Sequence, residues 1–388
     1  MKQVQRRVLA YWPRLFFFTF VLILLQPQEL LAYLFFLPAF FLPLSGRGQY
    51  RPLYLWLGWS FFSTLWAPGS ASLLRTWGAE GIIAGAGYVA GLFGREDRRW
   101  LVALQVIGLL TGGLILVQAA VAPSFPPGWV APAERGVLPF RATGLWSNPN
   151  RTGLFLAYLL PLFLAGAEEA KGKTRRRRSG VFLAMVLIGL TATALLFTYA
   201  RTAWVAALVA LFLYWGPREP ANCRRLVAAI LLLAGFMPSV AGRIGTNPLA
   251  SGTVAYRFLI WQETWSLVQK YPVTGAGHHE LRLALRPLRV DHVHNHYLQL
   301  AAEKGIPALL VFGWLLWRFR QSACRLGKEG RDDRLLWGVR AAFGGQLVAG
   351  LAESIWAVPL GSFFFWFAFA LVTAEGKPAV TSAAETPV

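Results

Sequence analysis

The sequence predicts an all-α membrane protein with about a dozen transmembrane helices, and three observations support that fold class. Of its 388 residues, 56% are hydrophobic and 14% are charged, whereas a soluble domain carries about 25% charged residues. Apolar runs recur from end to end, each close to the roughly 20 residues needed to cross about 30 Å of hydrocarbon. Backbone polar groups in lipid must be satisfied within their own segment, so these runs are predicted to be helices.

The apolar runs define the predicted spans. The first run is expected to remain as a membrane helix, because no small-residue cleavage site follows it. The chain is expected to form a single integral membrane domain, 1–388, with a disordered tail over 375–388. The predicted spans are residues 8–25, 29–44, 52–66, 77–94, 100–120, 150–167, 181–199, 202–216, 226–240, 297–317, 335–352 and 355–373.

The formal net charge of +20 does not predict a nucleic-acid partner, because the basic residues are confined to short connections between apolar runs. Most of them fall on one face of the predicted topology, together with both termini, and the positive-inside rule makes that face cytoplasmic. Cys223 and Cys324 also fall in cytoplasmic connections, where thiols stay reduced, so no disulfide is expected. These basic residues are therefore expected to contact membrane lipids rather than nucleic acid.

Two long connections lie on the opposite, external face. The first, 121–149, is rich in Pro and Gly and is predicted to be an irregular, ordered loop or lid. The second, 241–296, is long enough to fold, and it contains an amphipathic helix at 256–269 that Pro272 stops. A turn, TGAG at 274–277, then leads through HHELRLALRPLR and DHVHNHYLQL into the next membrane helix.

All the histidines of the protein lie in the second external loop, and packing does not require this clustering. A histidine that acts as general base or proton shuttle at a membrane surface is the preferred interpretation. One alternative is a zinc site, in which His292 and His296 share a helical face and Asp291 or Glu280 adds a ligand. The other is that these are ordinary polar residues of the membrane interface. The cluster consists of His278, His279, His292, His294 and His296.

Arginine is the second signal for chemistry on the external side. Arg201 lies between two apolar runs too closely joined for a real loop, so its guanidinium is expected at the external membrane boundary. Arg257 opens the amphipathic helix, with Trp261 and Trp265 on the same face. Arginine binds phosphate in a bidentate fashion, so the pattern suits a diphosphate near the bilayer surface. The alternative for Arg201 is snorkelling toward lipid headgroups. A further basic helical face is predicted from the spacing of Arg282, Arg286 and Arg289.

The rarity of charge within the predicted spans argues against a transporter or flippase, the rival class of membrane protein. A transporter predicts inverted repeats and charged residues near the bilayer midplane. Here the candidate residues instead gather at one interface. Glu353, in GLAESIW near an external helix end, is a further buried-charge candidate, which could pair with an arginine or serve a structural role.

Four segments resemble motifs of the O-antigen ligase and polymerase superfamily, most clearly over about 141–320. The family's H-N-x-x-L-Q-like motif, followed by E-x-G at the end of a long periplasmic loop, is similar to DHVHNHYLQLAAEKGIPALL. Its R-x3-W helix and P-x2-G-x-G turn resemble YRFLIWQETWSLVQKYPVTGAG. Its Ser/Thr-x-x-Arg helix junction resembles LFTYARTAWVAAL, and its Gly-x3-Asn-Pro-Asn motif resembles GLWSNPNRTGLFLAYLLP.

The resemblance implies a GT-C-like glycosyltransferase of the bacterial inner membrane, which moves a glycan from undecaprenyl diphosphate to an acceptor hydroxyl on the periplasmic face. By motif, His294 corresponds to the catalytic histidine because Asn295 follows it, and Arg257 and Arg201 correspond to arginines that engage the lipid diphosphate. The resemblance implies neither a metal nor a nucleotide cofactor. Substrate binding is further assigned to Arg282, Arg286, Asn295 and His292.

The acceptor separates two activities within this superfamily: lipid A core for a ligase, and another lipid-linked repeat for a polymerase. Many O-antigen polymerases carry R-x10-G motifs in their external loops. None of the external arginines of this sequence has a glycine at that offset. The sequence therefore favours an O-antigen ligase, with a polymerase as the alternative.

Overall fold

The fold was obtained as a computed structural model, and within its described part every secondary-structure element is a helix, which confirms the all-α prediction. The predicted span 226–240 lies outside that part, as do the tail 375–388 and nearly all of the predicted span 29–44. The structure describes residues 16–25, 33, 50–68, 73–95, 97–121, 140–146, 148–169, 175–216, 219–222, 224–225, 253–328 and 333–374.

The helices follow the apolar runs closely, with two corrections. The run predicted as a single span over 355–373 is divided at Val358, where the backbone is extended, into a short 3-10 helix and an α-helix that begins at Pro359. The run predicted as a single span over 297–317 is two helices, because Gly305 adopts a φ of +80° that ends the first of them. In chain order the helices are Phe16–Leu25, α3 (Arg51–Trp66), α4 (Leu73–Gly94), α5 (Arg99–Val121), α6 (Pro149–Glu169), α7 (Arg175–Phe197), α8 (Arg201–Trp215), α11 (Thr253–Lys270), α12 (Gly277–Leu285), η5 (Arg286–Leu288), α13 (His296–Lys304), α14 (Ile306–Lys328), α15 (Arg334–Ala349), η6 (Ile355–Ala357) and α16 (Pro359–Thr373).

Three of the described helices are both long and apolar enough to cross a membrane: Arg99–Val121, Pro149–Glu169 and Ser179–Phe197. Two shorter apolar helices, α8 and α16, have 15 residues each, which corresponds to about 22 Å at 1.5 Å per residue. These helices are those of a membrane protein. The full set of about twelve crossings stays a prediction.

The chain forms two compact units. The first unit comprises residues 1–103, 261–332 and 354–388, and the second comprises 104–260 and 333–353. Helix α11 belongs to both, since the division falls between Ile260 and Trp261.

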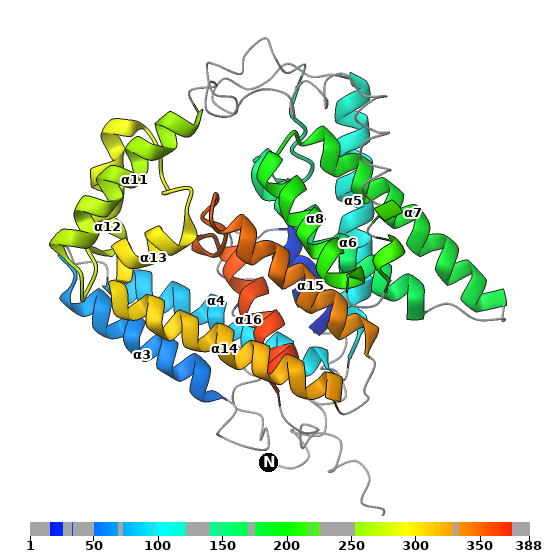
Figure 1. Cartoon of the computed structure of the whole chain (residues 1–388), viewed down its shortest axis with the longest axis horizontal. Helices are drawn as coiled ribbons and strands as arrows, with labels where there is room; N and C mark the ends of the chain where they lie inside the picture. The colour runs from blue at the N-terminus through cyan, green and yellow to red at the C-terminus, as the bar shows by residue number, and fades with distance from the viewer. Residues whose placement is uncertain are drawn as a thin grey trace, which may run out of the picture. The chain divides into compact units, whose positions relative to one another are not determined.

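In the first unit, α4 and α16 pack along their length because two glycines let their backbones approach (Figure 1). Gly87 and Gly91 are four residues apart on α4, and a Cβ at either would overlap the carbonyl oxygen of Phe363 or Phe367. Small residues at this spacing are typical of helix pairs in membranes, where close backbone approach replaces the hydrophobic effect as the source of attraction.

A polar network also lies inside the first unit, within a region that the sequence predicts to be nearly free of charge. Glu80 on α4 accepts hydrogen bonds from Trp56 at 2.8 Å and Ser60 at 2.6 Å, and it pairs with Lys304 of α13 at 2.6 Å. Trp59 of α3 donates to the carbonyl oxygen of Lys304 at 3.0 Å. These contacts attach the end of α13 to α3 and α4.

In the second unit, α15 packs between α6 and α8 through further glycines (Figure 1). A Cβ at Gly345 would overlap the carbonyl oxygen of Ala206, and one at Gly338 would lie 2.8 Å from that of Pro161. The buried amide of Gln346 donates to the carbonyl oxygen of Leu154 at 2.9 Å. This tight packing places the segment after α15, which contains Glu353, beside the first turn of α6.

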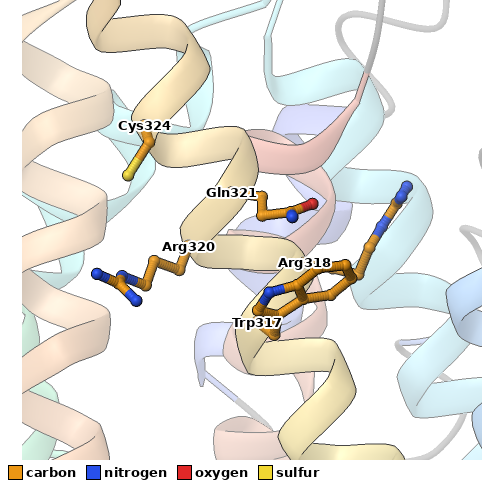
Figure 2. A pocket seen from close by; sticks show the side chains of 5 residues that line it. All are labelled: Trp317, Arg318, Arg320, Gln321 and Cys324. Atoms are coloured by element: carbon orange, nitrogen blue, oxygen red, sulfur yellow. The ribbon is translucent and has the colours of Figure 1, made fainter.

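The second half of α14 carries a shallow hollow lined by polar and aromatic side chains (Figure 2). Figure 2 shows the guanidinium groups of Arg318 and Arg320 pointing to opposite sides of the helix, so they do not converge on one ligand as a binding site would require. Arg318 lies over the ring of Trp314, 5.9 Å from its centroid. The sequence analysis predicts that these basic residues lie on the cytoplasmic face, and this orientation stays a prediction. The hollow is lined by Trp317, Arg318, Arg320, Gln321 and Cys324.

Candidate functional site

The second unit holds a buried network of charged and amide groups that begins at Arg141. The Arg141 side chain donates from Nε to the carbonyl oxygen of Thr198 at 3.0 Å and from Nη2 to Oδ1 of Asn150 at 2.6 Å. Thr198 lies in the connection between α7 and α8. Arg141 is only 9% exposed. It was not among the predicted site residues, although its place seven residues before the Asn-Pro-Asn motif is a signal in the sequence.

The Asn-Pro-Asn motif forms the start of α6. Asn148 accepts the backbone N–H groups of Asn150 at 2.9 Å and Arg151 at 3.2 Å on its Oδ1, as an N-cap residue does. Pro149 occupies the first helical position, where the missing N–H costs nothing. The motif therefore fixes Asn150 on the first turn, where its side chain reaches both Arg141 and Glu353.

Glu353 completes the network and pairs with Arg257. The sequence offered an unspecified arginine partner as one of two alternatives for Glu353. One carboxylate oxygen, Oε1, accepts from Nη2 of Arg257 at 3.1 Å and from Nδ2 of Asn150 at 3.1 Å. The Glu353 side chain is 7% exposed and that of Arg257 is 22% exposed. Two family-motif residues, Arg257 and Asn150, thus meet on a carboxylate that the resemblance did not include.

The junction between α7 and α8 is as short as predicted. Tyr199 turns the chain with a left-handed φ of +51° and is buried. Arg201 is then the first residue of α8, and its side chain is half-buried. An arginine at this position adds to the partial positive charge of the helix N-terminus, so both favour an anion.

The histidine loop, residues 289–296, lies in the first unit, and its course corrects one prediction. Arg282, Arg286 and Arg289 do not share a helix, because α12 ends at Leu285 and Arg289 adopts a φ of +52°. Arg282 instead pairs with Asp291 at 3.1 Å, with both side chains largely exposed. Arg286 and Arg289 are also exposed. The prediction of a continuous basic helical face through these three arginines is therefore wrong.

Within this loop the structure brings His292 and His294 together and separates both from His296. The rings of His292 and His294 lie 4.5 Å apart between centroids, whereas His296 packs edge-on against Trp356 at 4.7 Å. Residues 290–295 are not helical, so the zinc alternative with His292 and His296 on one helical face is not formed. Asn295 is the N-cap of α13 and accepts the N–H of Leu298 at 3.0 Å.

The remaining histidines have distinct environments. Burial lowers the pKa of His296 to about 4, so its imidazole is neutral at physiological pH. The exposed His278 forms a hydrogen bond from Nδ1 to the carboxylate of Glu303 at 3.0 Å, which raises the pKa of His278. Among the described histidines, His292 and His294 are the two that are half-exposed. Their rings also lie next to each other.

The turn before α12 and the turn after α13 pack closely against each other, and each contains a glycine. Gly275 has a φ of +74°, and a Cβ there would overlap the backbone of Glu303 and Lys304. Gly305 has a φ of +80°, and a Cβ there would overlap the carbonyl oxygen of Val273. The P-x2-G-x-G and E-x-G motifs are thus two halves of one close backbone contact, which only glycine permits.

A comparison with protein-family models finds that the model described as O-antigen ligase matches residues 183–313. The resemblance to the O-antigen ligase superfamily is confirmed. The matched range includes Arg201, Arg257 and His294. No curated protein matches the chain significantly.

The O-antigen ligase match does not reach the whole buried network of the second unit. Arg141 and Asn150 precede the matched range and Glu353 follows it, yet hydrogen bonds join all of them to Arg257 or to one another. The signal for Glu353 in the sequence was an acidic residue in an apolar context. The structure was needed to identify Arg257 as the arginine that pairs with Glu353.

Proposed function

We propose that this protein is an O-antigen ligase, which transfers a glycan from undecaprenyl diphosphate to a hydroxyl of lipid A core on the periplasmic face of the inner membrane. The observation that carries the proposal is the O-antigen ligase match over 183–313, because that range holds Arg201, Arg257 and His294. The polymerase alternative differs only in the acceptor, and the lack of R-x10-G motifs in the external loops favours the ligase.

Arg257 and Arg201 would hold the donor's diphosphate. A guanidinium has five N–H donors, and the hydrogen bond to Glu353 uses one at Nη2, so further donors remain for phosphate oxygens. Positive charge on the diphosphate stabilises the transition state, because negative charge builds on the leaving group as the glycosidic bond breaks. Arg282 and Arg286, exposed in the first unit, are proposed to attract the anionic donor or acceptor.

His294 would accept the proton of the acceptor hydroxyl. The hydroxyl oxygen bonds to the anomeric carbon, the bond from that carbon to the diphosphate oxygen breaks with its electron pair, and the proton moves to the imidazole. His292 is proposed to contact the acceptor beside His294, and Asn295 to hold the start of α13 in place. Since the leaving group is already a good one, orientation and electrostatics can supply most of the catalysis.

The test is transfer in vitro from a lipid-linked donor to lipid A core, using purified protein in detergent. Arg257→Ala and Arg201→Ala are expected to weaken donor binding, and the corresponding lysine variants are expected to restore little, because a point charge lacks the bidentate fork. His294→Ala is expected to lower turnover by about 10²–10⁴-fold. Arg320→Ala, an exposed arginine on α14, serves as the control and should behave as wild type.

Each result separates the proposal from its alternatives. Product on another lipid-linked repeat, with none on lipid A core, would make the protein a polymerase. Full activity of Arg201→Lys would reduce Arg201 to a snorkelling residue. Inactivation of the wild type by EDTA would revive the metal interpretation, which the resemblance does not imply.

A further inference from the structure

Val293, the residue that precedes His294, is held through both of its backbone polar groups. The backbone N–H of Val293 donates to Oε1 of Gln299 at 3.3 Å, and its carbonyl oxygen accepts from Nε1 of Trp261 at 3.0 Å. Val293 itself is fully buried. Because side chains of α13 and α11 hold the N–H and the carbonyl oxygen of Val293, the loop cannot move there without breaking a buried hydrogen bond.

The orientation of the Gln299 side-chain amide is fixed by its two hydrogen-bond partners. Gln299 is 2% exposed, and its Nε2 donates to Oε1 of Glu303, one turn further along α13, at 2.8 Å. An ionised carboxylate can only accept hydrogen bonds, so Glu303 obliges Gln299 to present its NH₂ group there and its oxygen to Val293. His278 contacts the same oxygen of Glu303 at 3.0 Å and completes the chain.

His294 needs such support because of its backbone conformation. Its φ is +55°, in the left-handed region that residues with a Cβ seldom adopt. Such conformations cost roughly 1–3 kcal/mol and persist only where surrounding contacts hold them. Asn295 fixes the C-terminal side of His294 by capping α13, and Gln299 fixes the N-terminal side through Val293.

We propose that Gln299 is a positioning residue for His294: its side-chain amide, oriented by Glu303, holds the backbone N–H of Val293 and so fixes the chain next to His294. The proposal rests on the function proposed above, in which His294 accepts the acceptor's proton. The proposal explains the spacing of the H-N-x-x-L-Q and E-x-G motifs. Gln299 and Glu303 lie four residues apart on one face of α13, so the Glu303 carboxylate can orient the Gln299 amide. Gln299 is also close enough to hydrogen-bond the loop that precedes α13.

The first measurement is the steady-state kinetics of Gln299→Ala. Turnover is expected to fall by about 10²-fold, the typical effect of displacing a catalytic group by about 1 Å, while KM for the donor stays unchanged. The matched control is Gln346→Ala, which removes another buried glutamine that donates to a backbone carbonyl, on α15. An equal loss of turnover in both variants would mean a general packing effect and would overturn the proposal.

The second measurement combines Gln299→Ala with His294→Ala. If Gln299 acts through His294, its removal should cost nothing further once the imidazole is gone. The same factor in both backgrounds would overturn this inference and leave the proposed function intact. Wild-type activity of His294→Ala alone would instead remove the proposed function.

The third measurement is an exchange that keeps the hydrogen bonds, and it decides the matter even if Gln299→Ala fails to fold. Gln299→Glu places a second carboxylate against Glu303 and should lose activity at neutral pH. The double variant Gln299→Glu/Glu303→Gln swaps donor and acceptor, so that the Val293 N–H and the amide at position 303 both still find an acceptor. It should regain most of the lost turnover, and failure to do so in a folded protein would refute the positioning role.

Discussion

Replacement of Glu353 tests the buried network of the second unit most directly. Glu353→Ala removes the oxygen that accepts from both Arg257 and Asn150 at 3.1 Å, and it leaves Arg257 without that carboxylate. Glu353→Gln keeps an oxygen acceptor for both donors and removes only the charge. The pair of variants therefore separates the contribution of the hydrogen bonds from that of the ion pair.

The structure sets the expected magnitudes. Removing one partner of a buried ion pair costs about 3–5 kcal/mol. The Arg257 side chain is 22% exposed and can recruit water in place of Glu353, so Glu353→Ala is expected near the lower end, about 3 kcal/mol. Glu353→Gln should cost about 1 kcal/mol, the difference between hydrogen bonds to charged and to neutral groups.

The assay is equilibrium unfolding in detergent, with fluorescence of the tryptophans as the signal. Arg257→Met, Glu353→Leu and the double variant Arg257→Met/Glu353→Leu close a thermodynamic cycle. The double variant should lose less stability than the sum of the single changes, because neither charge is then left buried alone. Additive losses, or a Glu353→Ala variant that unfolds at the wild-type denaturant concentration, would show that the ion pair contributes nothing to stability and would refute the reasoning.

Three further predictions concern the first unit and the topology. Because burial lowers the folded-state pKa of His296 to about 4 from an unfolded value near 6.5, the stability that it contributes is present above pH 6.5. That stability should be lost as the pH falls toward 4, by about 3 kcal/mol in total, and His296→Phe should flatten this dependence. Gly91→Ala should destabilise the α4–α16 pair by about 1–3 kcal/mol through overlap with Phe367, whereas Gly189→Ala, which meets open space, should be neutral or stabilising. In intact spheroplasts an impermeant thiol reagent should label Leu283→Cys and spare the native, exposed Cys324; the reverse pattern would invert the orientation.

Part of the candidate site was visible in the sequence because it depends on local spacing. The short junction before Arg201 and the amphipathic helix that carries Arg257 each involve residues a few positions apart. The residues within one turn of a helix end decide where that helix begins or stops, so the sequence predicts these positions directly. The prediction of one helix through Arg282, Arg286 and Arg289 was wrong for the same reason, since Pro287 and the left-handed Arg289 end the regular helix locally.

Sequence alone determined that the described part of this protein is all-helical, where most of its described helices lie, and that most of its candidate charges and histidines gather in a few connections. Apolar length and turn residues decide these features within each segment. Tertiary structure decided which groups meet: Glu353 with Arg257, 96 positions away, His292 with His294 rather than His296, and Gly275 against the Glu303–Lys304 backbone. Such contacts depend on how helices pack, and helix packing is fixed by close approach at glycines and by buried polar pairing that no local pattern encodes.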